Sequence, residues 1–287
     1  MLNPRRAVCL LAVLVLACSP LALTQGTHTQ IDYPGALLTT PLGINTPGDV
    51  VGTYYDTADV EHGFLLSGGT FTTIDFPGAT STVTTGLNDA GQMVGYYQVG
   101  TSTFHAFLFD GSNFTTIDFP GSYGTLAMGI NNSTQVAGYY YVKPNHAVGF
   151  ELSGGNFTTV QPPGRYADAY LNGINNLGDF TGDLNHTPTS PGQSFHLNLS
   201  YGVYTSVAFP GAAWTLAWGL NDNNLIVGYY PLSASRESGF VFIKGKYYAI
   251  RVPDARSTVC IGINASNQIV GQFQDSTGNY HGYLRTP

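Results

Sequence analysis

Short runs of β-branched and aromatic residues, separated by Gly, Asn and Asp, follow one another along nearly the whole chain. Residues 79–121 illustrate the pattern with four such runs, at 82–88, 92–97, 105–109 and 114–119. The residues between these runs are rich in Gly, Asn, Asp and Pro, which is typical of tight turns. The pattern predicts four short β-strands in this segment.

The second predicted strand of each unit is apolar on both faces. Met93 and Val94 precede Gly95, and they point to opposite faces because side chains alternate along a strand. The residue two before this glycine is, in the successive units, Val50, Met93, Val136, Phe180, Ile226 or Ile269. A sheet with two apolar faces must be covered on both sides, whereas a plain sandwich would show one polar face per strand.

The same unit recurs six times. Each unit has a glycine in a Gly-Ile/Leu-Asn triplet and a second glycine nine residues later. Successive units are 43 residues apart, with a slight stretch around the fourth copy. A period of about 40–45 residues with four strands per unit is typical of a propeller blade. We therefore predict an all-β, six-bladed β-propeller of four-stranded antiparallel blades. The Gly-Ile/Leu-Asn triplet that marks each unit begins at Gly43, Gly86, Gly129, Gly173, Gly219 and Gly262.

The two ends of the chain complement each other. The last unit stops at 284–287, after its third strand, and residues 29–35 repeat the fourth-strand sequence found at 73–78. We expect the N-terminal strand to complete the last blade, which would lock the ring and remove an open sheet edge. The predicted domain is one propeller over 27–287. Its predicted blades are 36–78, 79–121, 122–164, 165–211, 212–254, and 255–287 together with 27–35.

The block Gly-Leu-Asn-Asp-Ala-Gly-Gln-Met-Val-Gly-Tyr at 86–96, followed by His-Ala-Phe at 105–107, resembles the bacterial extracellular HAF repeat, named for its His-Ala-Phe. The resemblance covers essentially all of 27–287. It implies a secreted bacterial repeat protein of unknown function with a propeller-like fold, and it implies no particular reaction. Three copies lack the histidine, so we do not expect it to be a catalytic residue that all six copies share. The residues in its place are Val148, Gln193 and Ser238.

Charge and composition narrow the classes of partner. Charged residues make up only 9% of the chain, against about 25% in average soluble domains. The formal net charge is −7 and the isoelectric point is near 5.3. This balance argues against a nucleic-acid partner and offers no basic patch to an anionic lipid surface. Few charged residues are available for an active site, and we expect a monomer without a cofactor.

Residues 1–24 have the pattern of a signal peptide, because Arg5 and Arg6 precede an apolar run at 7–17. That run is short for a bilayer and no second long apolar run follows, so we expect no membrane span. The sequence Val-Leu-Ala-Cys, which ends at Cys18, also matches a bacterial lipoprotein box, in which Cys18 would carry a lipid anchor. We expect a secreted or cell-surface protein, with a periplasmic or outer-membrane lipoprotein as the alternative.

One face of the ring is expected to carry the long loops between second and third strands. Tyr96, Tyr139 and Tyr229 occupy one equivalent position just after the second glycine, at the strand ends on this face. Asp183 and Gln272 take that position in two other copies. Tyrosine offers a flat apolar body and a polar tip, which suit a carbohydrate or a peptide. The alternative is that these side chains fill gaps between blades.

The fourth copy departs most from the repeat. Its loop at 183–193 is extended and carries prolines, and Arg165 follows its Pro-Gly turn. This departure indicates either a function or sequence drift, so we include Arg165 and Asp183 among the candidate ligand-binding residues.

Threonines recur four residues before the first glycine of five units. We expect them to reflect strand preference and local backbone hydrogen bonds, although they could also ring the mouth of the axis. These residues are Thr39, Thr82, Thr125, Thr215 and Thr258.

Histidines and aspartates also recur, on the third and fourth strands. We expect the histidines to be packed or at the rim, too far apart to share a metal ion, so we predict no metal site. We expect the aspartates to hydrogen-bond at turns and not to form the acid pair of a glycosidase. The two sets are His62, His105 and His281, and Asp32, Asp75 and Asp118.

Three functions remain open. The sequence favours a non-catalytic binding or interaction module for a glycan, peptide or protein on the long-loop face, because repeated positions lack the singular residues of an active site. The first alternative is a carbohydrate-active hydrolase or lyase with its site at the axis, which requires acids or a His/Tyr/Arg group within about 10 Å. The second alternative is a purely structural or adhesive surface protein.

Overall fold

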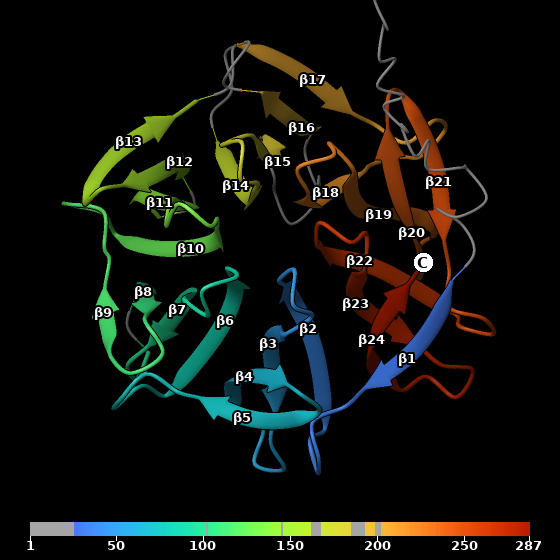
Figure 1. The fold of residues 1–287 in the computed structure, drawn as a ribbon, viewed down its shortest axis with the longest axis horizontal. Helices are drawn as coiled ribbons and strands as arrows, with labels where there is room; N and C mark the ends of the chain where they lie inside the picture. The colour runs from blue at the N-terminus through green and yellow to red at the C-terminus, as the bar shows by residue number, and fades with distance from the viewer. Residues whose placement is uncertain (1–25, 102, 145, 162–167, 185–192, 199–201) are drawn as a thin grey trace, which may run out of the picture.

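The computed structural model describes residues 26–101, 103–144, 146–161, 168–184, 193–198 and 202–287. They form six four-stranded antiparallel sheets, arranged as blades around a central axis (Figure 1). The chain is therefore an all-β, six-bladed propeller, and the fold predicted from the repeat is confirmed. The predicted signal peptide with Cys18, and the candidate residue Arg165, lie outside the described residues.

The first five blades are each built from four consecutive strands, counted from the axis outward. The first blade contains β2 (Leu38–Ile44), β3 (Val50–Tyr55), β4 (Glu61–Ser67) and β5 (Thr70–Ile74). The second contains β6 (Ser81–Leu87), β7 (Met93–Gln98), β8 (His105–Phe109) and β9 (Phe114–Thr116). The third contains β10 (Gly124–Ile130), β11 (Val136–Lys143), β12 (His146–Ser153) and β13 (Asn156–Val160). The fourth contains β14 (Ala169–Ile174), β15 (Phe180–Leu184), β16 (Gln193–Asn198) and β17 (Val203–Val207). The fifth contains β18 (Leu216–Leu220), β19 (Ile226–Ser233), β20 (Arg236–Ile243) and β21 (Lys246–Ile250).

The last blade joins the two ends of the chain. Its inner strands are β22 (Ser257–Ile263), β23 (Ile269–Gln274) and β24 (Tyr280–Thr286), and β1 (Thr27–Ile31) is its outermost strand. β1 runs antiparallel to β24, with Gln30 opposite Tyr283 and Ile31 opposite Gly282. In Figure 1 the blue N-terminal strand lies along the red C-terminal ones. The predicted closure is confirmed, and the last blade gains the outer strand that the C-terminal segment lacks.

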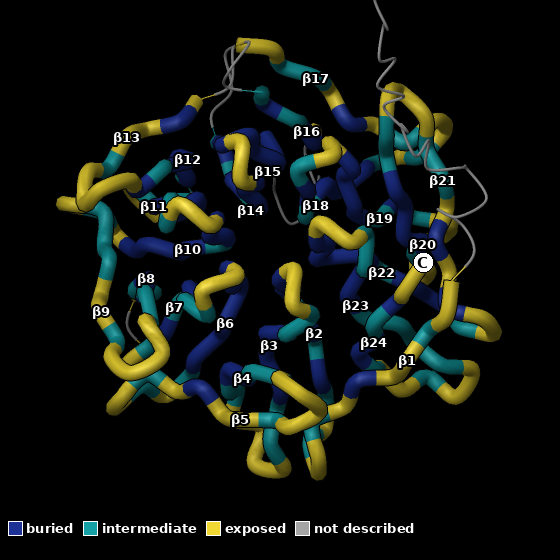
Figure 2. Tube along the Cα trace, in the orientation of Figure 1, coloured by how far each residue is buried: buried dark blue, intermediate teal, exposed yellow. Residues whose placement is uncertain are grey.

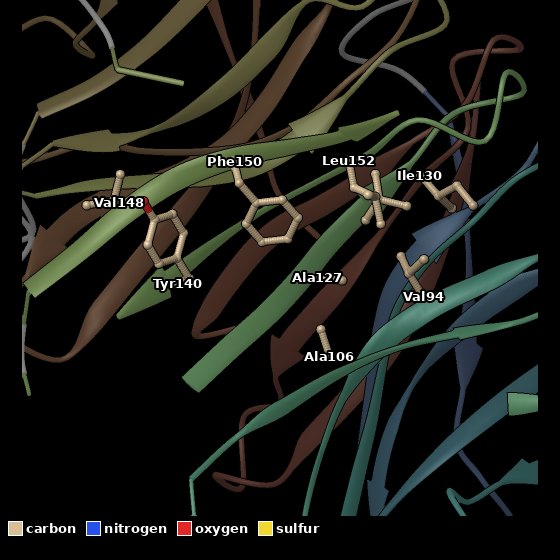
Figure 3. Packing of buried hydrophobic residues seen from close by; sticks show 9 residues of the cluster. Val94, Ala106, Ala127, Ile130, Tyr140, Val148, Phe150 and Leu152 are labelled. Atoms are coloured by element: carbon tan, nitrogen blue, oxygen red, sulfur yellow. The ribbon is translucent and has the colours of Figure 1, made fainter. Parts of the chain in front are cut away.

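The second glycine of each unit is required by the close approach of a strand and an aromatic ring. A Cβ added at Gly95 would lie 1.9 Å from the carbonyl oxygen of Val83 and 2.9 Å from the ring of Phe107. Figure 3 shows the equivalent ring of Phe150 within the hydrophobic cluster around Tyr140. Glycine and ring therefore recur together because the ring packs on bare backbone. The rings are completely buried in all six blades, at Phe64, Phe107, Phe150, Phe195, Phe240 and Tyr283.

A threonine and a stacked aromatic pair fix the links between blades. The Phe76 N–H donates to the Thr82 hydroxyl at 3.0 Å, and the Phe76 ring stacks on Tyr97 with their centroids 3.6 Å apart. The recurring threonines therefore hold the backbone before each Pro-Gly turn, as the hydrogen-bonding interpretation predicts. The same contact is made by Thr39, Thr125, Thr215 and Thr258.

Burial decreases from the inner strands to the turns and outer strands (Figure 2). The second strands β3 and β15 are almost entirely buried, as their two apolar faces predict. Nowhere in the described part of the chain is there a helix with the length and apolar character needed to cross a membrane.

Candidate functional site

A closed ring of asparagines surrounds one mouth of the axis. The Asn88 side-chain amide donates to the backbone carbonyl of Asn131 in the next blade at 3.2 Å. Its Oδ1 accepts from the N–H groups of Ala90 and Gln92, which shapes the turn between the first two strands. The space inside this mouth is only about 80 Å³. The amide donations link successive blades and return to the start through Asn45, Asn88, Asn131, Asn175, Asn221 and Asn264.

Aspartates beside this ring are also engaged within the protein. Asp89 Oδ1 accepts from the Thr46 N–H at 2.8 Å, and its Oδ2 accepts from the Asn132 amide at 2.8 Å. Burial opposes ionisation of Asp89, but these hydrogen bonds outweigh it and hold the pKa below its usual value. The adjoining interior of the axis encloses about 90 Å³ between glycine, leucine and isoleucine residues. This end of the propeller is therefore a narrow, structural part of the molecule.

The opposite end holds a much larger cavity, of about 420 Å³, which is lined by the fifth and last blades and by Leu38 of the first blade. Trp218 on β18 contributes an indole wall, and Tyr280 at the start of β24 contributes an exposed phenol. Gln272 and Gln274 on β23 add amide groups, and Glu237 on β20 adds a carboxylate. Aromatic surface and hydrogen-bonding groups therefore converge in one concave site. The remaining lining residues are Leu38, Tyr229, Ser257, Val259, Ile261 and Phe273.

The cavity lies where the repeat changes from tyrosine to glutamine. Tyr96 and Tyr139 are half-buried, and the Tyr139 ring meets Tyr170 of the next blade edge-on, with centroids 4.9 Å apart. In the last blade the same position is Gln272, whose Nε2 donates to the Thr40 hydroxyl of the first blade at 2.9 Å. Gln272 therefore reaches toward the next blade, as Tyr139 does, and lines the cavity with an amide in place of a ring.

Of the six predicted ligand-binding residues, the structure brings Tyr229 and Gln272 together in this cavity. Tyr96 and Tyr139 lie between other blades and do not line it, which agrees with the gap-filling alternative for those two. Their role in ligand binding, like that of Arg165 beyond the described residues, stays a prediction.

Tyr229 is a neutral phenol in this setting. Burial raises its pKa well above the usual value, and the negative charges of Asp183 and Glu237 add to the rise, while the neighbouring Trp218 side chain opposes it. The hydroxyl therefore acts as a hydrogen-bonding group and not as a phenolate nucleophile.

Asp183 is buried between the fourth and fifth blades, outside the cavity lining. Its carboxyl accepts from the Ser194 hydroxyl and from the Asn172 amide, the latter at 2.7 Å. Burial raises its pKa to about 7, although both of these hydrogen bonds act in the opposite direction. Ser194 Oγ also lies 2.7 Å from the carbonyl oxygen of Thr215 in the fifth blade, so the network ties the two blades together.

The recurring histidines and aspartates are partners within a blade. His105 Nδ1 lies 2.6 Å from Asp118 Oδ2, and His62 Nδ1 lies 2.8 Å from Asp75 Oδ2. Each pair ties the start of a third strand to the end of the fourth strand beside it, near the outer edge of its own blade. The hydrogen-bonding interpretation of the aspartates is therefore supported.

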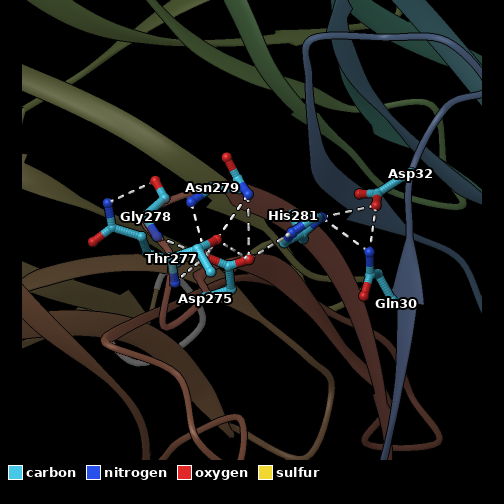
Figure 4. Close-up of polar contacts among 8 residues, drawn as sticks. Gln30, Asp32, Asp275, Thr277, Gly278, Asn279 and His281 are labelled. Atoms are coloured by element: carbon cyan, nitrogen blue, oxygen red, sulfur yellow. Dashed lines mark hydrogen bonds and ion pairs between the residues drawn. The ribbon is translucent and has the colours of Figure 1, made fainter.

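The last blade extends this pairing to a third group, as Figure 4 shows. His281 Nδ1 lies 2.8 Å from Asp32 of the N-terminal segment, and its Nε2 lies 3.5 Å from Asp275. Asp275 Oδ1 accepts from the N–H groups of Thr277, Gly278 and Asn279, which fixes the loop before β24. Among the described residues there is no group of three or more His, Cys, Asp or Glu that could hold a metal ion.

Sequence reasoning did not select Trp218, Glu237, Ser257 and Tyr280 as ligand-binding candidates. The contact of Glu237 with Ser257 recurs in the first blade as that of Glu61 with Ser81, so the repeat does not single it out. The loss of tyrosine at Gln272 was no sufficient signal, because Thr53 and Asp183 also replace it.

No family model and no curated protein matches the chain. Among solved structures, a fucose-specific lectin from Aleuria aurantia is similar over 88% of this chain and 93% of its own, with 14% identity and a TM-score of 0.52. A mutant of AofleA from Arthrobotrys oligospora is similar over 90% of this chain and 86% of its own, with 14% identity and a TM-score of 0.56. Trypanosoma rangeli sialidase is similar over 93% of this chain and 58% of its own, with 6% identity and a TM-score of 0.54. At these identities the comparisons show the propeller fold and assign no family.

Proposed function

We propose that the protein is a non-catalytic glycan-binding module whose ligand occupies the cavity lined by the fifth, last and first blades. The observation that carries this proposal is the composition of the cavity wall. A sugar has apolar C–H faces and a hydroxyl edge. Trp218 and Tyr280 offer aromatic surface to the C–H faces, and the amide and carboxylate groups of the wall can hydrogen-bond to the hydroxyls. The volume of about 420 Å³ lies within the range of about 300–1,000 Å³ typical of small-ligand sites.

The fold supports the same function class. Two of the similar structures are a fucose-specific lectin and a complex of the Aleuria aurantia lectin with Fucα1-6GlcNAc. Membership of the HAF-repeat family, a bacterial origin and secretion or surface attachment, with or without a lipid at Cys18, are parts of this proposal. They rest on the sequence pattern alone.

A carbohydrate-active enzyme is the weaker candidate. Glycoside hydrolysis ordinarily uses two carboxyl groups on either side of the scissile bond, about 5–10 Å apart. In the part of the chain that the structure describes, Glu237 is the one acidic residue of the cavity lining, and the buried carboxyl of Asp183 is held by Ser194 and Asn172 outside it.

A glycan array on the purified protein tests the proposal, with bound hits titrated by the fluorescence of the two tryptophans. Tyr280 is 49% exposed at the cavity, so Tyr280→Ala should keep the fold and weaken binding by about tenfold or more. Tyr123 is 56% exposed and lies outside the cavity, so Tyr123→Ala is the matched control and should bind normally. Binding to no glycan, or equal binding by both variants, would overturn the proposal.

A further inference from the structure

Among the described residues that line the cavity, Glu237 is the one charged side chain, and its position is fixed. The buried Ser257 hydroxyl donates to Glu237 Oε2 at 2.5 Å, and the Glu237 N–H donates back to Ser257 Oγ at 2.9 Å. The two residues belong to adjacent blades, β20 of the fifth and β22 of the last. The carboxylate is thus held at the cavity wall by the blade interface itself.

No cation neutralises this carboxylate within the described part of the chain. None of the ion pairs formed there includes Glu237, and the cavity lining contains no Lys, Arg or His. The nearest arginine in sequence, Arg236, is exposed and directs its Nε to the backbone carbonyl of Arg256 at 2.8 Å. The wall of the cavity therefore carries a net negative charge, and the whole chain has a formal net charge of −7.

The other polar groups of the wall include donors as well as acceptors. One amide proton of Gln272 is given to Thr40, and one of Gln274 is given to the Gly278 carbonyl at 3.0 Å. The Ser257 hydroxyl proton is given to Glu237. The buried indole N–H of Trp218 has no partner within the described residues, so the wall offers a ligand a donor too. Glu237 is the charged group among them, and its carboxylate only accepts hydrogen bonds.

We propose that the cavity selects uncharged glycans and rejects glycans whose bound sugar carries a carboxylate or a sulfate. Sugar hydroxyls donate to Glu237 and to the glutamine oxygens, and hydrogen bonds to a charged acceptor are stronger than neutral ones. An acidic sugar brings a second anion and further acceptors into a half-buried site without a cation, where like charges repel strongly. This inference rests on the proposed function and names the chemical class of its ligand.

Matched neutral and acidic sugars test the inference. The glycan array should yield neutral hits, and each hit is then titrated beside its acidic counterpart, such as glucose with glucuronic acid or galactose with galacturonic acid. We expect the acidic member of each pair to bind roughly tenfold more weakly or worse. Raising the salt concentration should narrow the difference for the unmodified protein, because ions screen the repulsion.

Glu237→Gln is the decisive variant, because it keeps the shape of the side chain and removes its charge. It should reduce the preference for the neutral sugar to about threefold or less. Glu61→Gln is the matched control. Glu61 is the equivalent residue of the first blade and accepts from Ser81 at 3.0 Å, but it lies outside the cavity. The Glu61→Gln variant should therefore prefer the neutral sugar as strongly as the unmodified protein does.

The outcomes separate the two proposals. If acidic sugars bind as tightly as their neutral partners, or if Glu237→Gln leaves the preference unchanged, the inference is wrong and glycan binding stands. If no glycan of either kind binds, the proposed function fails and takes the inference with it. Should Glu237→Gln fail to fold, the salt dependence of the unmodified protein decides, and a preference that salt does not narrow would contradict the inference.

Discussion

At the scale of single residues, the repeat is a set of polar contacts as much as a set of apolar positions. The asparagine of each Gly-Ile/Leu-Asn triplet is almost completely buried, yet both ends of its amide are satisfied. A buried amide without partners would be costly, so the ring of side-chain donations is what permits asparagine at the mouth of the axis. The motif therefore encodes contact between blades as well as a turn within one.

Removing one member of the asparagine ring should destabilise the whole propeller. Asn221→Ala deletes the donation to Asn264 at 2.9 Å and two acceptor contacts within its own turn. We expect the free energy of unfolding, measured by denaturant titration, to fall by about 2–3 kcal/mol. Asn223→Ala changes an exposed side chain in the same turn and should alter the free energy of unfolding by less than about 0.5 kcal/mol. Equal effects of the two variants would contradict a structural role for the ring.

The buried carboxyl of Asp183 predicts a pH dependence of stability. Its pKa is about 7 in the folded protein and about 3.9 in an unfolded chain. The folded state therefore keeps a proton that the unfolded chain loses. Consequently the stabilising contribution is complete below about pH 4 and is lost as the pH rises to about 7, by up to about 4 kcal/mol.

Asp183→Asn isolates this contribution. The unfolding free energy of the unmodified protein should fall relative to that of the variant between pH 4 and pH 7, when both are measured by denaturant titration at several pH values. Parallel pH profiles for the two proteins would show that Asp183 is ionised in the folded state across this range.

At the scale of strands and blades, the sequence predicted the architecture better than the partners of individual side chains. The triplet glycines and the ring position of Phe107 define a period, and a period determines the number of blades. The pairing of His105 with Asp118 was not foreseen, because it depends on the register between β8 and the segment after β9. The cavity depends on residues of different blades, such as Trp218 and Glu237, whose proximity only the folded ring creates.

The outer strand β1 should contribute to stability as much as an outer strand that follows its blade directly. Ile31 on β1 is 5% exposed, and its equivalent on β5, Ile74, is 7% exposed. We expect Ile31→Ala and Ile74→Ala each to lower the free energy of unfolding by about 2–4 kcal/mol, because both leave a cavity in a packed core. A much smaller loss for Ile31→Ala in the same denaturant titration would indicate that β1 is only loosely attached.

At the scale of the whole molecule, six similar blades produce an asymmetric protein. One end of the axis is narrowed by the asparagine ring, and the other carries the large cavity beside the fifth, last and first blades. β1 starts at Thr27 opposite Thr286, at the end of β24 remote from Tyr280. The chain therefore enters the propeller at the asparagine end, and the cavity opens at the end away from that entry.

The number of ligand sites per chain follows from this asymmetry. The large cavity is lined by residues of the fifth, last and first blades, and neither Thr53 nor Asp183, which also replace the tyrosine, lines it. We therefore expect one site per chain and not one per blade. Restoring the tyrosine with Gln272→Tyr should fill that site without removing any other side chain that lines it.

Isothermal titration calorimetry with a neutral glycan from the array measures the number of sites. We expect one bound glycan per chain for the unmodified protein and no measurable binding for Gln272→Tyr. Several equivalents bound per chain, or undiminished binding by a folded Gln272→Tyr variant, would contradict this expectation.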